Sequence, residues 1–122
     1  MITLYKTKVI NIGNEAEMFR EEGMIILFGE NAPESLSDYC YNIKVEPVTG
    51  EIEAGMELSI GSEKYSVTAV GSVVRKNLSE LGHITIKFDG SREAELPGTL
   101  YVEDKALPEI TIGEEIFISG GH

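Results

Sequence analysis

Two histidines and one cysteine are the side chains of this 122-residue chain best suited to nucleophilic or metal chemistry. His83 lies within NLSELGHITIKFDG, residues 77–90, and His122 is the last residue. A neutral imidazole is a nucleophile and a metal ligand near neutral pH. His83 is therefore a candidate phosphoryl acceptor or metal ligand, and the competing interpretation is a histidine bonded to a backbone group or water. His122 is a weaker candidate because of its terminal position.

Most other catalytic signatures are missing from the sequence. The cysteine and the histidines do not have metal-ligand spacing, although a cluster of carboxylates remains open. No Walker loop or dinucleotide fingerprint is present, and the Gly-Ser pairs at 61–62 and 71–72 lack a G-x-S-x-G elbow. A Ser-His-Asp triad assembled in space also remains open. We expect no cofactor and no metal.

Charge and composition narrow the class of partner. The chain has 21 acidic and 10 basic side chains, a formal net charge of -11. Such a field repels nucleic acid and anionic lipid and attracts a basic protein surface, or it serves solubility alone. The longest apolar run, Met24 to Phe28, is far shorter than the roughly 20 residues of a membrane helix. With no secretory signal and a lone cysteine, we expect a cytoplasmic protein that does not insert into the membrane.

Alternating polar and apolar residues predict that the chain is mainly β. The segment 56–70 has the pattern of a hairpin that turns at Gly61-Ser62. Further strands are predicted over residues 2–10, 24–28, 83–88, 99–103 and 114–119. Exposed edges of such strands would allow a homodimer, although the sequence does not specify the oligomeric state.

The helical signal is weak and confined to three short segments. Asn14 is a predicted cap for residues 15–21, with Met18 and Phe19 facing inward. Residues 33–37 begin with a proline suited to a first helical turn, and Asn77 resembles a helix cap whose turn ends at Gly82. We therefore expect one domain over residues 1–122, a β-barrel or sandwich with a few short helices.

Strand parity assigns faces to the candidate side chains. On the strand that begins at His83, the apolar side chains Ile84, Ile86 and Phe88 point one way. His83, Thr85 and Lys87 share the opposite, more polar face. If residues 38–45 are extended, four side chains form an apolar stripe that is either core or a docking face: Tyr39, Tyr41, Ile43 and Val45. Cys40 then lies on the other face, where a lone cysteine is usually buried filler.

Two long runs carry a family resemblance. VTAVGSVVRKNLSELGHITIKFDGSREAELPGTLYVE, residues 67–103, and ILFGENAPESLSDYC, residues 26–40, resemble the glucitol/sorbitol-specific IIA component of the bacterial phosphotransferase system. The resemblance implies a small cytoplasmic β-rich protein. It also implies that a histidine accepts a phosphoryl group from the histidine phosphocarrier protein and passes it to the IIB/IIC components of a membrane sugar permease.

The chain departs from the family at the reactive position. The resemblance places the phosphoacceptor histidine four residues beyond the tyrosine of a Tyr-Cys pair, which is Ile43 here, and a second histidine at Val45. An alkyl group cannot accept a phosphoryl group, and three interpretations stay open. In one, His83 is the acceptor and Lys87 offsets the phosphoryl charge. In the second, the chain is a regulatory or binding paralogue that keeps the fold without the transfer. An unrelated β-domain is the third interpretation.

Overall fold

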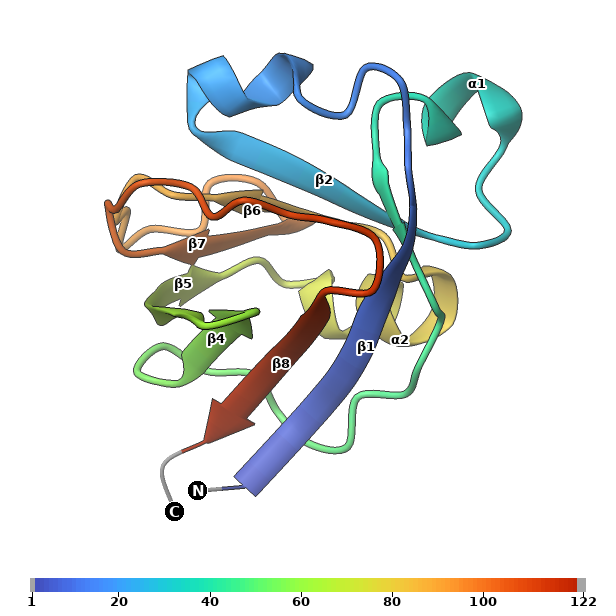
Figure 1. The fold of residues 1–122 in the computed structure, drawn as a ribbon. Coiled ribbons are helices and arrows are strands. Elements are labelled where there is room, and N and C mark those ends of the chain that lie inside the picture. The colour runs from blue at the N-terminus through green and yellow to red at the C-terminus, as the bar shows by residue number, and fades with distance from the viewer. Residues whose placement is uncertain (1, 121–122) are drawn as a thin grey trace.

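Residues 2–120 are described by the computed structural model, and their eight strands close into a barrel (Figure 1). The strands follow the order β1-β3-β2-β6-β7-β5-β4-β8 around the barrel. Their bounds are β1 (Ile2–Ile12), β2 (Met24–Gly29), β3 (Tyr41–Ile43), β4 (Glu57–Ile60), β5 (Glu63–Val70), β6 (Ile84–Lys87), β7 (Thr99–Val102) and β8 (Glu115–Gly120). This confirms the predicted fold class, and the closed order makes the molecule a barrel.

The longest strand, β1, joins the two parts of the barrel. It pairs antiparallel with β8 through its first half and with β3 through its second half. The register of β1 shifts between Thr3 and Tyr5 and again between Val9 and Asn11, and such irregularities bend a strand around a barrel. Closure pairs every strand on both sides, so the open edges that would allow a homodimer do not exist in residues 2–120.

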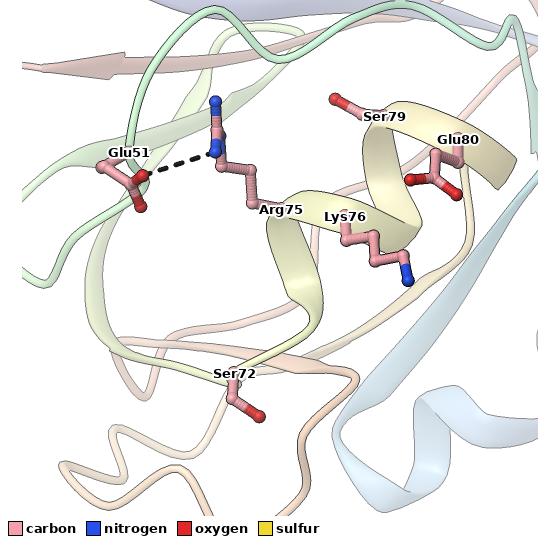
Figure 2. A pocket seen from close by; sticks show the side chains of 6 residues that line it. All are labelled: Glu51, Ser72, Arg75, Lys76, Ser79 and Glu80. Atoms are coloured by element: carbon pink, nitrogen blue, oxygen red, sulfur yellow. Dashed lines mark hydrogen bonds and ion pairs between the residues drawn. The ribbon is translucent and has the colours of Figure 1, made fainter.

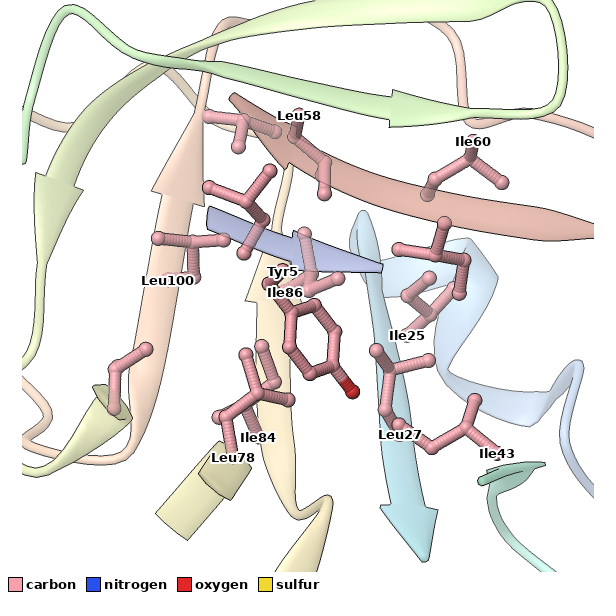
Figure 3. Packing of buried hydrophobic residues seen from close by; sticks show 14 of the residues in the cluster. Tyr5, Ile25, Leu27, Ile43, Leu58, Ile60, Leu78, Ile84, Ile86 and Leu100 are labelled. Atoms are coloured by element: carbon pink, nitrogen blue, oxygen red, sulfur yellow. The ribbon is translucent and has the colours of Figure 1, made fainter. Parts of the chain in front are cut away.

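The barrel interior is filled with aliphatic and aromatic side chains (Figure 3). The predicted hairpin illustrates why: Leu58 and Ile60 of β4 are buried, as are Tyr65 and Val67 of β5. β6 follows its predicted parity, since Ile84, Ile86 and Phe88 are buried and the residues between them are half-buried. The period-two pattern therefore predicted the core of these strands correctly.

Three short helices lie outside the barrel: η1 (Met18–Glu22), α1 (Glu34–Ser37) and α2 (Val74–Leu81). Two predicted caps are wrong. η1 begins after Glu17 rather than Asn14, and Ala16 fills the buried position while Met18 is exposed. Asn77 lies inside α2, because the helix begins at Val74, and Val74 and Leu78 together form its buried face. Gly82 ends α2 as predicted, with a left-handed φ of 66°.

No helix in the described range is long and apolar enough to cross a membrane. In Figure 1, η1 and α1 occupy the same upper end of the barrel, at either end of β2. This end of the molecule carries the candidate site.

Candidate functional site

A hollow of about 240 Å³ lies at the end of the barrel that η1, β2 and α1 form. We call it the His83 groove. Seven side chains line it: Phe19, Ile26, Phe28, Leu36, Tyr39, Cys40 and His83. Six of them come from residues 19–40. His83 belongs to the second half of the chain and lies beside them because β6 pairs with β2. The groove combines an apolar lining with one imidazole.

The local structure fixes the position of His83. Gly82 adopts a left-handed conformation that turns the chain from α2 into β6, and the His83 backbone N–H donates a hydrogen bond to Asn77 O (3.2 Å). The imidazole stacks on the Phe28 ring, with centroids 4.1 Å apart and planes 6° apart. The ring is thus oriented by α2 on one side and β2 on the other.

Burial lowers the pKa of His83 below its ordinary value of 6.5. The apolar groove penalises the protonated ring, because a charged imidazolium loses hydration there without gaining an acidic partner. The ring is therefore neutral at neutral pH, and the neutral imidazole is the nucleophilic form. The side chain remains half-buried, so a reactant can reach it.

Ile43 lies on the opposite side of the barrel wall from His83. It has no exposed surface and belongs to the core, and its Cδ1 would be 3.4 Å from a Cβ on Gly82. Figure 3 shows it among the interior side chains, near Leu27. The position where the resemblance places the acceptor thus lies beside Gly82, the residue before His83, but its side chain faces inward.

The predicted docking face is wrong for two of its four members. Tyr41 and Ile43 are buried, because β3 inserts between β1 and β2 and both of its faces are covered. Val45 follows the end of β3 and is half-buried. Tyr39 is 37% exposed and lines the His83 groove, so it alone of the four is placed to meet a partner there.

Lys87 is not brought to His83. The two residues are four positions apart along β6, about 13 Å at the rise of a strand. Lys87 Nζ instead forms an ion pair with the Asp89 carboxylate (3.7 Å). No cationic side chain lines the groove in the described part of the chain. The one nearby in sequence, Arg20, donates hydrogen bonds to Pro108 O (2.8 Å) and Tyr41 Oη (3.5 Å).

Cys40 is buried against the groove but is not a nucleophile at neutral pH. Its Sγ donates a hydrogen bond to Leu36 O (3.1 Å), and burial raises its pKa to about 11. The group is therefore a protonated thiol, whereas the thiolate is the reactive species. Its role is to close the wall of the groove.

A second hollow, of about 400 Å³, lies along α2 (Figure 2). Its charges do not converge on a ligand: Arg75 pairs with Glu51 (3.4 Å), and Lys76 points away from that pair. Ser79 Oγ is already engaged, since it accepts a hydrogen bond from the Val48 backbone N–H (2.8 Å). Within residues 2–120 no cluster of three or more His, Cys, Asp or Glu side chains could hold a metal ion. His122 lies outside the described residues.

Sequence reasoning found His83 because histidine is rare in this chain, and it named Tyr39 as a docking residue, but it gave no site role to the other apolar residues of the groove. Phe19 and Phe28 were expected only as core residues, and Leu36 carried no signal. Phe28 closes the apolar run of β2, which the sequence pattern does not distinguish from a strand buried along its whole length. The groove arises from three segments that meet only in the folded barrel.

Comparison with known proteins agrees with this architecture. Residues 4–117 match the family model described as the PTS system glucitol/sorbitol-specific IIA component. Proteins described as the PTS system glucitol/sorbitol-specific EIIA component, from Shigella flexneri and from Escherichia coli (strain K12), are each 41% identical over 113 residues. Those alignments cover 93% of this chain and 92% of each relative. The crystal structure of a PTS system IIA component from Enterococcus faecalis V583 is 31% identical, with a TM-score of 0.81 over 92% of this chain and 97% of that one.

Proposed function

Because the chain belongs to the glucitol/sorbitol-specific IIA component family of the phosphotransferase system, we propose that it is a cytoplasmic phosphocarrier that uses His83. In this proposal the histidine phosphocarrier protein donates the phosphoryl group, and the IIB/IIC components of a membrane sugar permease receive it. The observation that carries the proposal is the His83 ring, which is neutral, half-buried and part of the lining of an open groove.

The reaction requires no cofactor. The lone pair of the unprotonated His83 nitrogen attacks the phosphorus while the P–N bond to the donor imidazole breaks, and the donor nitrogen keeps that electron pair. The same type of bond is formed and broken, so no oxidant or external nucleophile enters. Phosphoryl transfer has a loose transition state, and the protein mainly positions the two rings. The stack on Phe28 supplies that positioning on this side.

The apolar lining has two consequences for the chemistry. It keeps water away from the bound phosphoryl group, which slows hydrolysis of a labile P–N bond. It also leaves the phosphoryl charge without a lysine or arginine from the groove, and Lys87 is too far along β6 to help. In the proposed reaction the donor protein supplies the groups that offset this charge.

A second candidate function is a regulatory or binding paralogue that no longer transfers phosphoryl groups. One observation favours it: a buried isoleucine, Ile43, occupies the position where the resemblance places the family acceptor. Such a protein would keep the groove as a docking surface for the same partners.

A phosphorylation assay separates the two functions. The chain is incubated with phosphoenolpyruvate, enzyme I and the histidine phosphocarrier protein, and phosphohistidine is identified by its lability in acid and its stability in alkali. The variants are His83→Gln, which keeps the size of the side chain, and His122→Ala, which tests the other histidine. We expect the wild type and His122→Ala to be labelled and His83→Gln to remain unlabelled. An unlabelled wild type, with a fully labelled phosphocarrier protein in the same tube, would instead support the paralogue.

A further inference from the structure

Two glycines face each other next to the stacked rings of His83 and Phe28. β2 and β6 pair antiparallel, and their register, continued one residue past the last pair, places Phe28 opposite His83. The following position places Gly29 opposite Gly82. Each glycine is therefore the chain neighbour of one of the two stacked residues, and side chains directly opposite each other in antiparallel strands are in contact distance.

The space in front of Gly29 is filled by the end of α2. A Cβ atom on Gly29 would collide with the carbonyl oxygen of Leu81, the last residue of that helix. It would also lie 3.2 Å from the carbonyl carbon of Leu81 and 2.5 Å from Val45 Cγ2. Gly29 is not among the glycines with a positive φ, so this position requires glycine for space and not for conformation.

Gly82 meets both requirements at once. Its φ of 66° is left-handed and ends α2, and the next residue, His83, donates its backbone N–H to Asn77 O (3.2 Å). A Cβ atom on Gly82 would lie 3.0 Å from both the Cα and the N of Gly29, and 3.4 Å from Ile43 Cδ1. The backbone at the end of α2 and the backbone of β2 are thus in contact, with no side chain between them.

We infer that Gly29 and Gly82 position the imidazole of His83 on the ring of Phe28, and we call the two glycines the glycine seat. The inference rests on the proposed function for the use of the ring, and it makes both glycines positioning residues that act through His83. The stack has its centroids 4.1 Å apart and its planes 6° apart, so it requires the two backbones at this short separation.

A displacement at the seat reaches the imidazole over a single peptide bond. The apolar face of α2 is buried, so the helix cannot move away as a whole from a Cβ atom on Gly29. The strain is instead relieved at the turn through Gly82, and His83 is the next residue. Orientation of the nucleophile is the main contribution of a protein to phosphoryl transfer, so a tilted ring should react more slowly.

The first experiment measures the ring in the unphosphorylated, full-length chain by NMR. The variants are Gly29→Ala and Gly82→Ala, and the second is the milder because its Cβ contacts are longer. Two readouts are taken: the nuclear Overhauser effect between the ring protons of His83 and Phe28, and the pKa of His83. We expect both variants to weaken the Overhauser effect and to raise the pKa towards 6.5, because the imidazole loses its apolar cover.

Two other glycines provide matched controls. Gly23 has a left-handed φ of 76° and a Cβ atom there meets nothing within 4 Å, so Gly23→Ala reproduces the backbone strain of Gly82→Ala without the crowding. Gly71 precedes the opposite end of α2, where a Cβ atom would collide with Pro97 O and lie 2.6 Å from Leu96 O. Gly71→Ala therefore reproduces the crowding at a distance from the stack. Both controls should keep the wild-type Overhauser effect and pKa, and urea unfolding measures the stability lost in each variant.

The second experiment measures labelling with phosphoenolpyruvate, enzyme I and the histidine phosphocarrier protein. At about pH 7.5 the imidazole is neutral in every variant, so a slower rate reports its orientation and not its protonation. We expect the labelling rate of Gly82→Ala to fall about tenfold and that of Gly23→Ala to stay within about twofold of the wild type.

The inference is overturned if the seat variants keep the wild-type Overhauser effect and pKa, or if the controls change them equally. It is also overturned if neither seat variant folds, since the glycines would then serve folding alone. Labelling of the seat variants at the wild-type rate, with a displaced ring, would reject the positioning role as well.

Failure of the proposed function gives a different result. An unlabelled wild type whose ring is displaced in the seat variants would reject the phosphocarrier and keep the seat as the device that orients His83. A labelled wild type whose ring is unchanged in both seat variants would reject the seat and keep the phosphocarrier.

Discussion

The imidazole of His83 lies face to face with the ring of Phe28, with centroids 4.1 Å apart and planes 6° apart. The two residues come from the adjacent strands β6 and β2 and their flanks, so the pairing of these strands sets the contact. The Phe28 ring covers one face of the imidazole, and the nitrogen atoms at its edge remain available. This contact therefore links the stability of the barrel to the properties of the candidate acceptor.

Substitutions of Phe28 should distinguish the effect of its aromatic stack on His83 from the effect of its apolar bulk. Phe28→Leu keeps an apolar side chain and should lower the free energy of unfolding by about 1–2 kcal/mol, whereas Phe28→Ala should lower it by about 3 kcal/mol. Both should raise the pKa of His83 towards 6.5, because the imidazole loses its apolar cover. Urea unfolding measures the first effect, and NMR titration of the ring protons measures the second. An unchanged pKa in Phe28→Ala would show that another contact desolvates the ring.

The depressed pKa of His83 predicts how stability depends on pH. In the unfolded chain the ring takes up a proton near pH 6.5, and in the folded chain it does so only at lower pH. Between these two values the unfolded state binds more protons, so the free energy of unfolding falls as the pH falls through this window. Above pH 6.5 the contribution is constant.

The difference in stability between the wild type and His83→Gln isolates this effect, because other titrating groups are common to both. Phosphoryl acceptance should follow the same neutral ring, so its rate should fall to half only at a pH below 6.5. A phosphorylation rate that halves by pH 6.5, with the donor protein fully phosphorylated, would contradict the neutral His83 as acceptor.

Ile43 should behave as a core residue and not as a docking residue. Ile43→Val should cost about 1 kcal/mol of unfolding free energy and Ile43→Ala about 2–5 kcal/mol, since the side chain has no exposed surface. Neither change should alter the affinity for the histidine phosphocarrier protein while the protein is folded. Urea unfolding and an NMR titration with that protein give the two readouts. A small stability cost combined with weaker binding would place residue 43 at the surface.

Cys40 should react slowly with thiol reagents in the folded protein. Its side chain is 3% exposed and its pKa is raised to about 11, so almost no thiolate is present at neutral pH. Absorbance at 412 nm with Ellman's reagent should therefore rise far more slowly in buffer than in about 6 M guanidinium chloride, in which the thiol is fully exposed. Equal rates in the two solutions would show that the groove wall opens readily.

The sequence predicted most of the barrel because most strands have one face in the core and one in solvent. β4, β5 and β6 each alternate, and each was placed within a few residues. The sequence did not predict that both faces of β3 are buried. Tyr41, Asn42 and Ile43 are all buried there. Asn42 is accommodated there because its Oδ1 accepts hydrogen bonds from Asn11 Nδ2 (3.1 Å) and Ser37 Oγ (3.2 Å). No alternation exists to mark such a strand, so parity only put Tyr41 and Ile43 on one shared face and left open whether that face is core or a docking face.

Of the residues that line the candidate site, the sequence singled out His83 as an acceptor and Tyr39 as a docking residue. His83 was singled out by its chemistry, and the facing direction of its side chain followed from the parity of β6. Leu36 and Tyr39 reach it because residues 30–40 fold back beside β2, a result of packing that no local pattern encodes. Proximity of Lys87 was inferred from a shared face, but a shared face does not imply contact across four residues of strand.

The pairing of β1 with β8 brings Ile2 opposite Gly120, so the first and last strands of the described chain are neighbours. The second half of β1 pairs with β3, which is made early, but the first half must wait for nearly the whole chain to leave the ribosome before its partner β8 exists. Until then β2 and β6 expose apolar residues that the finished barrel hides. We expect nascent chains of this protein to depend on chaperones that shield such strands, and folding to be completed only after translation ends.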